Sequence, residues 1–104
     1  MYYCASVFQI AERDGKSDPS SLWEEQFLLI EASTEADAHS KAEQMVKNRA
    51  PSYLNKKGES VSWKFVKIER IYPIEDTALK TGTELFSRFL RDSEARSLLT
   101  PFEQ

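Results

Sequence analysis

The sequence is poor in the residues from which metal sites, disulfides and phosphate-binding loops are built. Its 104 residues include one cysteine, one histidine and three glycines. A single cysteine excludes an internal disulfide, which is typical of a reducing compartment, and we interpret Cys4 as a small buried side chain in a strand. Metal sites usually take several Cys or His ligands, and the isolated glycines form no phosphate-binding loop. We therefore predict no catalytic, cofactor or metal residue and no enzymatic activity.

Long apolar runs are also missing. No stretch approaches the roughly eighteen apolar residues that cross a bilayer, and the start, MYYCASVFQI, lacks the basic and apolar regions of a secretory signal. The composition, 40% hydrophobic and 30% charged, is that of a globular protein. We predict a cytoplasmic protein without membrane contact. It would form a single domain over residues 1–91 with a helical extension over residues 92–104.

Hydrophobic patterning predicts an α+β fold. The expected strands cover residues 2–11, 22–32, 61–74 and 83–91. Apolar residues recur at helical spacing from Thr34, and Pro51 stops this helix because proline disfavours helical geometry in the residue before it. The prediction is a four-stranded antiparallel sheet in the order ββαββ, with one long helix on one face and a short C-terminal helix.

Two strands carry further information. The strand at 22–32 is apolar on both faces, which is typical of a central strand covered on each side. In the strand at 61–74 the apolar positions change face after Phe65, which predicts a bulge or a strong twist midway and places Ile68 on the face opposite to that of Phe65. One sheet face would be covered by the helix and the other by the C-terminal helix, a second copy or a different protein. We favour a homodimer.

The only histidine lies in the segment TEADAHSKAE, where Glu35, His39 and Glu43 follow one another at four-residue spacing. This spacing suits an acid/base or metal constellation, but it also suits the first turns of an ordinary helix. Thr34 and Asp37 match the pattern of a capping box, which marks a helix start. We interpret His39 as an intrahelical partner of Glu35 or Glu43.

Exposed aromatic and apolar residues are the candidates for protein contact. These candidates are Trp23, Leu98, Leu99 and Phe102. Trp23, Trp63 and Phe65 suit either an aromatic ligand platform or the core, and core packing is the favoured interpretation because large rings bury much apolar area.

The charge is unevenly distributed, since residues 47–70 hold seven basic and two acidic residues while the whole chain has a net charge of −3. Lysines alternate with aromatic residues there, as in grooves that bind single-stranded nucleic acids. The candidate contacts are Lys56, Lys57, Lys64 and Lys67. Because no nucleic-acid-binding module is recognisable, this role is an alternative and not the leading prediction.

Four segments together resemble the bacterial family catalogued as domain of unknown function 4288. The segments are Trp23-Glu24, Ser33/Thr34 through Ala38, the V-x-W-x-F-x-x-I pattern of residues 61–68, and GTELFSR at residues 82–88. The resemblance covers about residues 3–91 and implies a small stand-alone α+β protein without an established activity. Its motif positions are those of a helix cap, core side chains and a turn.

The leading prediction is a non-enzymatic protein-interaction module that self-associates as a homodimer. One alternative is a nucleic-acid-associated module that uses the basic segment 47–70. Another is an immunity or inhibitor partner of a toxin or defence effector, because the acidic N-terminal half resembles a polyanion in charge.

Overall fold

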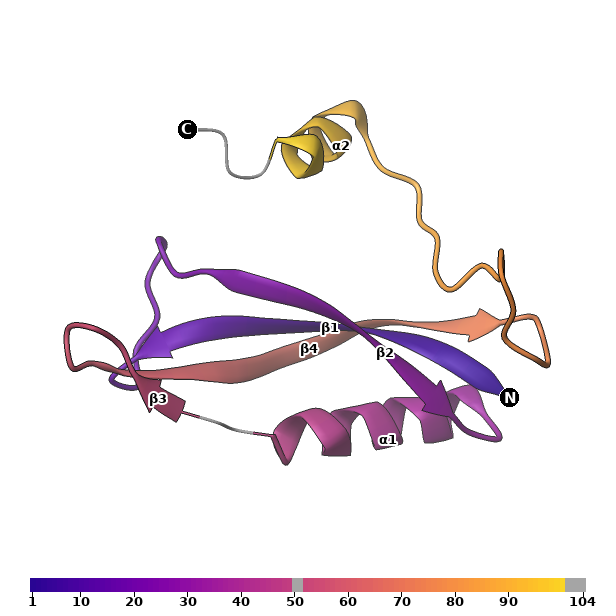
Figure 1. Cartoon of the computed structure of the whole chain (residues 1–104), viewed down its shortest axis with the longest axis horizontal. Coiled ribbons are helices and arrows are strands. Elements are labelled where there is room, and N and C mark those ends of the chain that lie inside the picture. Colours follow the sequence, from indigo (N-terminus) through magenta and orange to yellow (C-terminus); the bar gives the residue numbers. More distant parts are fainter. Residues whose placement is uncertain (50–51, 101–104) are drawn as a thin grey trace.

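A computed structural model describes residues 1–49 and 52–100 of the chain. The elements are β1 (Tyr2–Arg13), β2 (Trp23–Glu31), α1 (Glu35–Lys47), β3 (Ser52–Leu54), β4 (Ser60–Ile74) and α2 (Asp92–Leu99). The described strands form one antiparallel sheet in the order β2-β1-β4-β3, and α1 covers one of its faces (Figure 1). The α+β class and the four-stranded antiparallel sheet are confirmed, while the element order is ββαββα.

The β1–β2 hairpin and the start of α1 follow from local sequence. β1 pairs with β2 from Tyr2 opposite Glu31 to Ile10 opposite Trp23. The Thr34 hydroxyl accepts a hydrogen bond from the Asp37 backbone N–H at 3.1 Å, which caps the first turn of α1. The predicted Thr34 cap is therefore confirmed, whereas among the described residues the Asp37 carboxylate pairs with Lys41 and does not complete a capping box.

The prediction of a strand at residues 83–91 is wrong. These residues are extended but pair with no described strand. The fourth strand is β3, in a segment for which no strand was predicted. The hairpin that joins β3 to β4 is stabilised by the Asn55 side chain, which accepts hydrogen bonds from the backbone N–H groups of Lys57 and Glu59. Gly58 supplies the positive φ of 79° that this turn requires.

Two further predictions need correction. The helix α1 has 13 residues and ends at Lys47, so it is of ordinary length and not one long helix; Pro51 lies outside the described residues. The strand β2 lies at an edge of the sheet, and the central strands are β1 and β4. A short C-terminal helix does form, as α2.

The bulge predicted in the strand at 61–74 is present. The pairing of β1 with β4 shifts twice, between Ser6 and Val7 and between Phe8 and Gln9. Each shift inserts an extra β4 residue, so Ile68 stays on the same face as Phe65 and packs into the same core. The predicted change of face at Ile68 is therefore wrong. In a regular strand Phe65 and Ile68 would lie on opposite faces, but the extra residue between them returns Ile68 to the face of Phe65.

The core lies between α1 and the sheet. Ala38, Ala42 and Val46 form the buried side of α1, and small side chains let a helix approach the strands closely. The sheet contributes the buried side chains of Tyr3, Ala5, Val7, Ile30, Ile68 and Ile71. This core occupies only the α1 side of the sheet, and the opposite face has a different covering.

Candidate functional site

The sheet face opposite α1, called the outer face below, carries alternate residues of three strands. The strand register places on it Cys4, Ser6, Phe8, Ile10, Trp23, Glu25, Phe27, Leu29, Lys64, Lys67, Arg70, Tyr72 and Ile74. The segment of residues 83–91, called the strap below, passes over this face after leaving the end of β4 (Figure 1). The strap, and not α2, is thus the part of the chain that covers the second face.

Phe86 anchors the strap to the outer face. Its ring centroid lies 4.9 Å from that of Phe27 and 5.5 Å from that of Tyr72, both in tilted geometry. The Arg70 guanidinium carbon lies 5.8 Å from the centre of the same ring. Tilted aromatic pairs of this kind contribute about 0.5–1.5 kcal/mol each beyond the area that they bury.

An ion pair holds the strap at a second position, two residues after Phe86. Arg88 donates two hydrogen bonds to the Glu25 carboxylate, at 2.9 and 3.3 Å. The Ser6 hydroxyl, which is fully buried, donates a third at 3.2 Å. Both charged side chains are about three-quarters shielded from solvent, so this pair also determines where the strap lies.

An apolar cavity of about 360 Å³ opens beside the strap. Cys4, Phe27, Leu29, Ile74 and Leu85 contribute to its wall. Phe27, Leu29 and Leu85 are each about half exposed. The strap therefore leaves part of the apolar outer face open.

The Cys4 side chain is buried on the outer face, as the sequence predicted. Burial raises the pKa of the Cys4 thiol, and the neutral thiol is a poor nucleophile. We expect Cys4 to react with an aromatic disulfide reagent at pH 8 at least about tenfold more slowly in the folded protein than in urea. Equal rates of absorbance change in the two states would contradict the buried position of this thiol.

Three of the four predicted protein-contact residues lie in the described chain, and these three are exposed. Trp23 at the start of β2 is more than half exposed, and Leu98 and Leu99 of α2 are 53% and 80% exposed. Phe102 lies outside the described residues. Within the described chain, α2 makes no close contact with the sheet or with α1, and it stands apart from both in Figure 1. Phe89, at the end of the strap, is fully exposed as well.

The segment around the histidine is an ordinary helix start in the structure. His39 is exposed on α1 and forms no ion pair with any described residue. Glu43 pairs instead with Lys47 at 3.0 Å, and this hydrogen bond and charge lower the pKa of the Glu43 carboxyl. Within the described ranges, no three His, Cys, Asp or Glu side chains are grouped as metal ligands would be.

The four candidate lysines do not form one surface. Lys56 and Lys57 lie in the β3–β4 turn, whereas Lys64 and Lys67 lie on the outer face opposite Ile10 and Phe8. At about 3.3 Å per strand residue, Lys67 is roughly 23 Å along β4 from its first residue. The four lysines are close in sequence, which suggested a single basic groove. In the structure, the extended strand β4 separates Lys67 from the lysines of the turn.

The aromatic residues considered as a platform are also separated. Trp23 pairs with Ile10 and Trp63 with Ala11, so that the two indole rings lie on opposite faces of the sheet. Phe65 packs against the core on the α1 side, where the Lys47 ammonium lies 5.8 Å from its ring centre. Core packing is thus confirmed for Phe65 and wrong for Trp23, which is 56% exposed.

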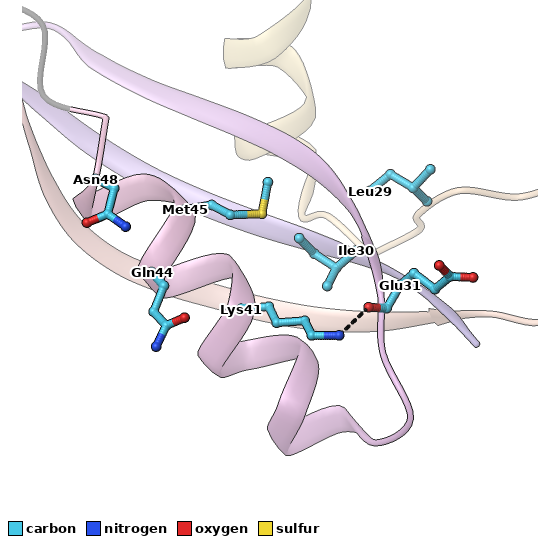
Figure 2. Close-up of a pocket in the computed structure, with 7 residues that line it drawn as sticks. All are labelled: Leu29, Ile30, Glu31, Lys41, Gln44, Met45 and Asn48. Atoms are coloured by element: carbon cyan, nitrogen blue, oxygen red, sulfur yellow. Dashed lines mark hydrogen bonds between the residues drawn. The ribbon is translucent and has the colours of Figure 1, made fainter.

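A second pocket, of about 300 Å³, lies between the edge strand β2 and α1 (Figure 2). Leu29, Ile30 and Glu31 form its strand side, and Lys41 and Met45 contribute from α1. The Lys41 ammonium donates a hydrogen bond to the Glu31 backbone carbonyl at 3.0 Å. This pocket was not predicted from the sequence, because β2 has the apolar pattern of a central strand. The half-exposed Met45 on a helix flank is the signal that points to it.

A comparison with family models finds one match. The model for the domain of unknown function DUF4288 matches residues 1–87. The match includes all four strands and most of the strap but ends before α2. No curated protein and no solved structure matches the chain. No described helix is long and apolar enough to cross a membrane.

Proposed function

The chain belongs to the family of the domain of unknown function DUF4288, and from this premise we propose that it is a non-enzymatic protein-interaction module that self-associates. Its surfaces are the open part of the outer face and the free C-terminal helix. The proposal therefore concerns what this domain binds and assigns no reaction to it.

The free position of α2 is the observation that carries the proposal. This helix has eight residues, and isolated helices shorter than about 12–15 residues are marginal in water. Helices of this length are normally stabilised by packing of an apolar side, yet Leu98 and Leu99 of α2 contact neither the sheet nor α1. A protein partner that covers the two leucines would supply the missing contact.

The outer face supports the same proposal. Trp23, Leu29 and Leu85 are each about half exposed on or beside it. Single exposed apolar residues are normal on protein surfaces, but contiguous ones mark interaction sites. The apolar cavity beside the strap makes this part of the surface concave, which suits an inserted apolar side chain of a partner.

Two measurements test the proposal separately. Light scattering after size exclusion is expected to give about twice the 12.0 kDa chain mass at high protein concentration. Quantitative capture from a cell extract is expected to retain a partner on the intact chain. The chain truncated after Arg91 and the double variant Leu98→Ser/Leu99→Ser are expected to lose it. The variant Ser97→Ala, on the same helix, serves as the matched control.

The proposal would be overturned by two results together: a monomer at high concentration, and equal capture of the partner by the intact chain and by the Leu98→Ser/Leu99→Ser variant. Salt-dependent binding of single-stranded oligonucleotides that disappears in Lys64→Ala/Lys67→Ala would favour a nucleic-acid role instead, because phosphate contacts release counterions.

A further inference from the structure

The outward edge of β2 is free to pair with another strand. Within the described chain, β2 has a partner on one side alone, namely β1. Ala11 donates its backbone N–H to the Leu22 carbonyl, and Ala32 donates to the Met1 carbonyl. Even-numbered residues of β2 therefore direct their backbone groups toward β1, because hydrogen-bonded and non-bonded pairs alternate in an antiparallel ladder. The odd-numbered residues direct theirs outward, and these residues are Trp23, Glu25, Phe27, Leu29 and Glu31.

This edge carries three glutamates but lacks the other usual protections against pairing. It has nine residues without proline, lysine or a bulge in its pairing with β1, and such edges template the addition of a further strand. Its N–H and C=O groups form a regular row, and the Lys41 ammonium reaches this row at the Glu31 carbonyl. The pocket of Figure 2 lies directly beneath the same edge, between β2 and α1.

We propose that β2 of a second copy pairs antiparallel with this edge, so that Phe27 of each chain lies opposite Phe27 of the other. The two sheets then become one continuous sheet of eight strands around a two-fold axis at Phe27. The proposal rests on the self-association proposed above and assigns it to the β2 edge, which leaves the outer face and α2 to a different protein partner.

The charges of the strand select this register. With Phe27 on the axis, Glu25 faces Leu29 and Glu31 faces Trp23 of the second copy, so no two glutamates are opposed. A shift by two residues in one direction opposes Glu25 to Glu31, and like charges directly opposite are destabilising. The same shift in the other direction opposes no glutamates, but it leaves Glu31 without a β2 residue opposite it and shortens the ladder.

A shift by one residue is excluded for a different reason. It would set the outward-directed backbone groups of one strand against the inward-directed groups of the other, so that no ladder forms. Of the symmetric registers, the one centred on Phe27 is thus the register that uses all the outward-directed residues without opposing glutamates.

The pocket beneath the edge adds charge complementarity. In this register Glu24 of the second copy lies opposite Ile30, on the α1 side of the sheet, where Lys41 also lines the pocket. The Lys41 side chain is about half exposed, and its ammonium already lies 3.4 Å from the Asp37 carboxylate. Glu24 of the second copy would bring a further carboxylate beside it. The Glu31 carbonyl keeps capacity for both the Trp23 N–H of the second copy and Lys41, because a carbonyl oxygen accepts two hydrogen bonds.

Disulfide trapping tests the register directly. In a Cys4→Ala background, Phe27→Cys places one thiol per chain at the two-fold axis. Opposite residues of a hydrogen-bonded pair have Cα atoms about 5.5 Å apart, within the roughly 4.4–6.8 Å that a disulfide spans. We expect most of the protein to run as a covalent dimer after mild oxidation, and Gln26→Cys in the same background to stay monomeric on the gel.

A second pair of variants does not depend on the Phe27 side chain. Leu29→Glu places a carboxylate opposite Glu25 of the second copy, whereas Leu29→Lys places an ammonium there. Both variants lose the same apolar contact, but their charges are opposite. The dimer dissociation constant of the glutamate variant is expected to be at least about tenfold higher than that of the lysine variant.

The outcomes separate this inference from the proposed function. A monomer by light scattering overturns self-association and this interface together. A dimer with no Phe27→Cys cross-link and equal dissociation constants for the two Leu29 variants overturns the β2 interface alone and moves self-association to another surface. Cross-linking through Gln26→Cys in place of Phe27→Cys overturns the register, because Gln26 meets itself only when the pairing is shifted.

Discussion

The replacement Ile30→Ala is expected to lower the free energy of unfolding by about 2–5 kcal/mol. Ile30 is 3% exposed and belongs to the cluster that joins β1, β2 and β4 to α1. Its neighbours on α1 include Ala38 and Ala42, and alanine side chains have no rotamers with which to fill a cavity. The lost transfer energy and the remaining cavity both destabilise the folded state.

The adjacent residue provides the matched control. Leu29 lies next to Ile30 in sequence but on the outer face, where it is 51% exposed. Leu29→Ala is expected to cost less than about 1 kcal/mol, as for most substitutions away from the core. Urea denaturation at low protein concentration measures both values without a contribution from self-association. Similar losses for the two variants would contradict the assignment of the core to the α1 side alone.

Local patterns in the sequence predicted those parts of the fold that depend on neighbouring residues. The strands β1 and β2 needed only the apolar pattern of two short segments, and the Thr34 cap needed only the residues of one helical turn. The bulge in β4 could also be anticipated, because the apolar period breaks after Phe65. Its effect on the face of Ile68 could not, since a bulge changes the alternation that the prediction assumed.

The strap shows why the remaining prediction failed. Residues 83–91 have the apolar alternation of a strand, but Phe86 meets Phe27 and Tyr72 through its ring, and the strap takes no place in the sheet. The same contact explains the two apolar faces of β2. They were interpreted as those of a central strand, whereas β2 is an edge strand whose second face lies partly under the strap. A strand has apolar residues on both faces when it is central in a covered sheet, and also when another segment of the chain lies over its second face. The sequence pattern is the same in the two cases.

The candidate site was predictable in part for a similar reason. Exposure of Leu98 and Leu99 was expected, whereas the favoured core position of Trp23 is wrong. Contact of these residues with a partner stays a prediction. The ion pair of Arg88 with Glu25 joins residues 63 positions apart, and the pocket beneath β2 depends on where α1 crosses the sheet. Contacts of this range depend on the assembled fold and leave no local signal.

The replacement Phe86→Ala is expected to release the strap while the sheet and α1 stay folded. It removes two tilted aromatic contacts and one cation–π contact from the outer face. Two aromatic pairs of about 0.5–1.5 kcal/mol each correspond to an opening equilibrium that rises by roughly tenfold to a hundredfold. Trypsin cleavage after Arg88 is the measurement, because this guanidinium must leave the Glu25 carboxylate before it can enter a protease. When opening and closing are fast, the cleavage rate follows the open population.

A second phenylalanine in the strap gives the control. Phe89 is fully exposed and takes part in none of the aromatic contacts of the described chain. Because it follows the cleaved bond, each rate is divided by the cleavage rate of a short peptide with the same sequence. The ratio for Phe89→Ala is expected to differ from that of the unaltered chain by less than about twofold. Mass analysis of the fragment ending at Arg88 separates strap opening from cleavage elsewhere. If Phe89→Ala accelerated cleavage as much as Phe86→Ala, the strap would not be held by its aromatic anchor. The Arg88–Glu25 pair would then be the contact that keeps it on the outer face.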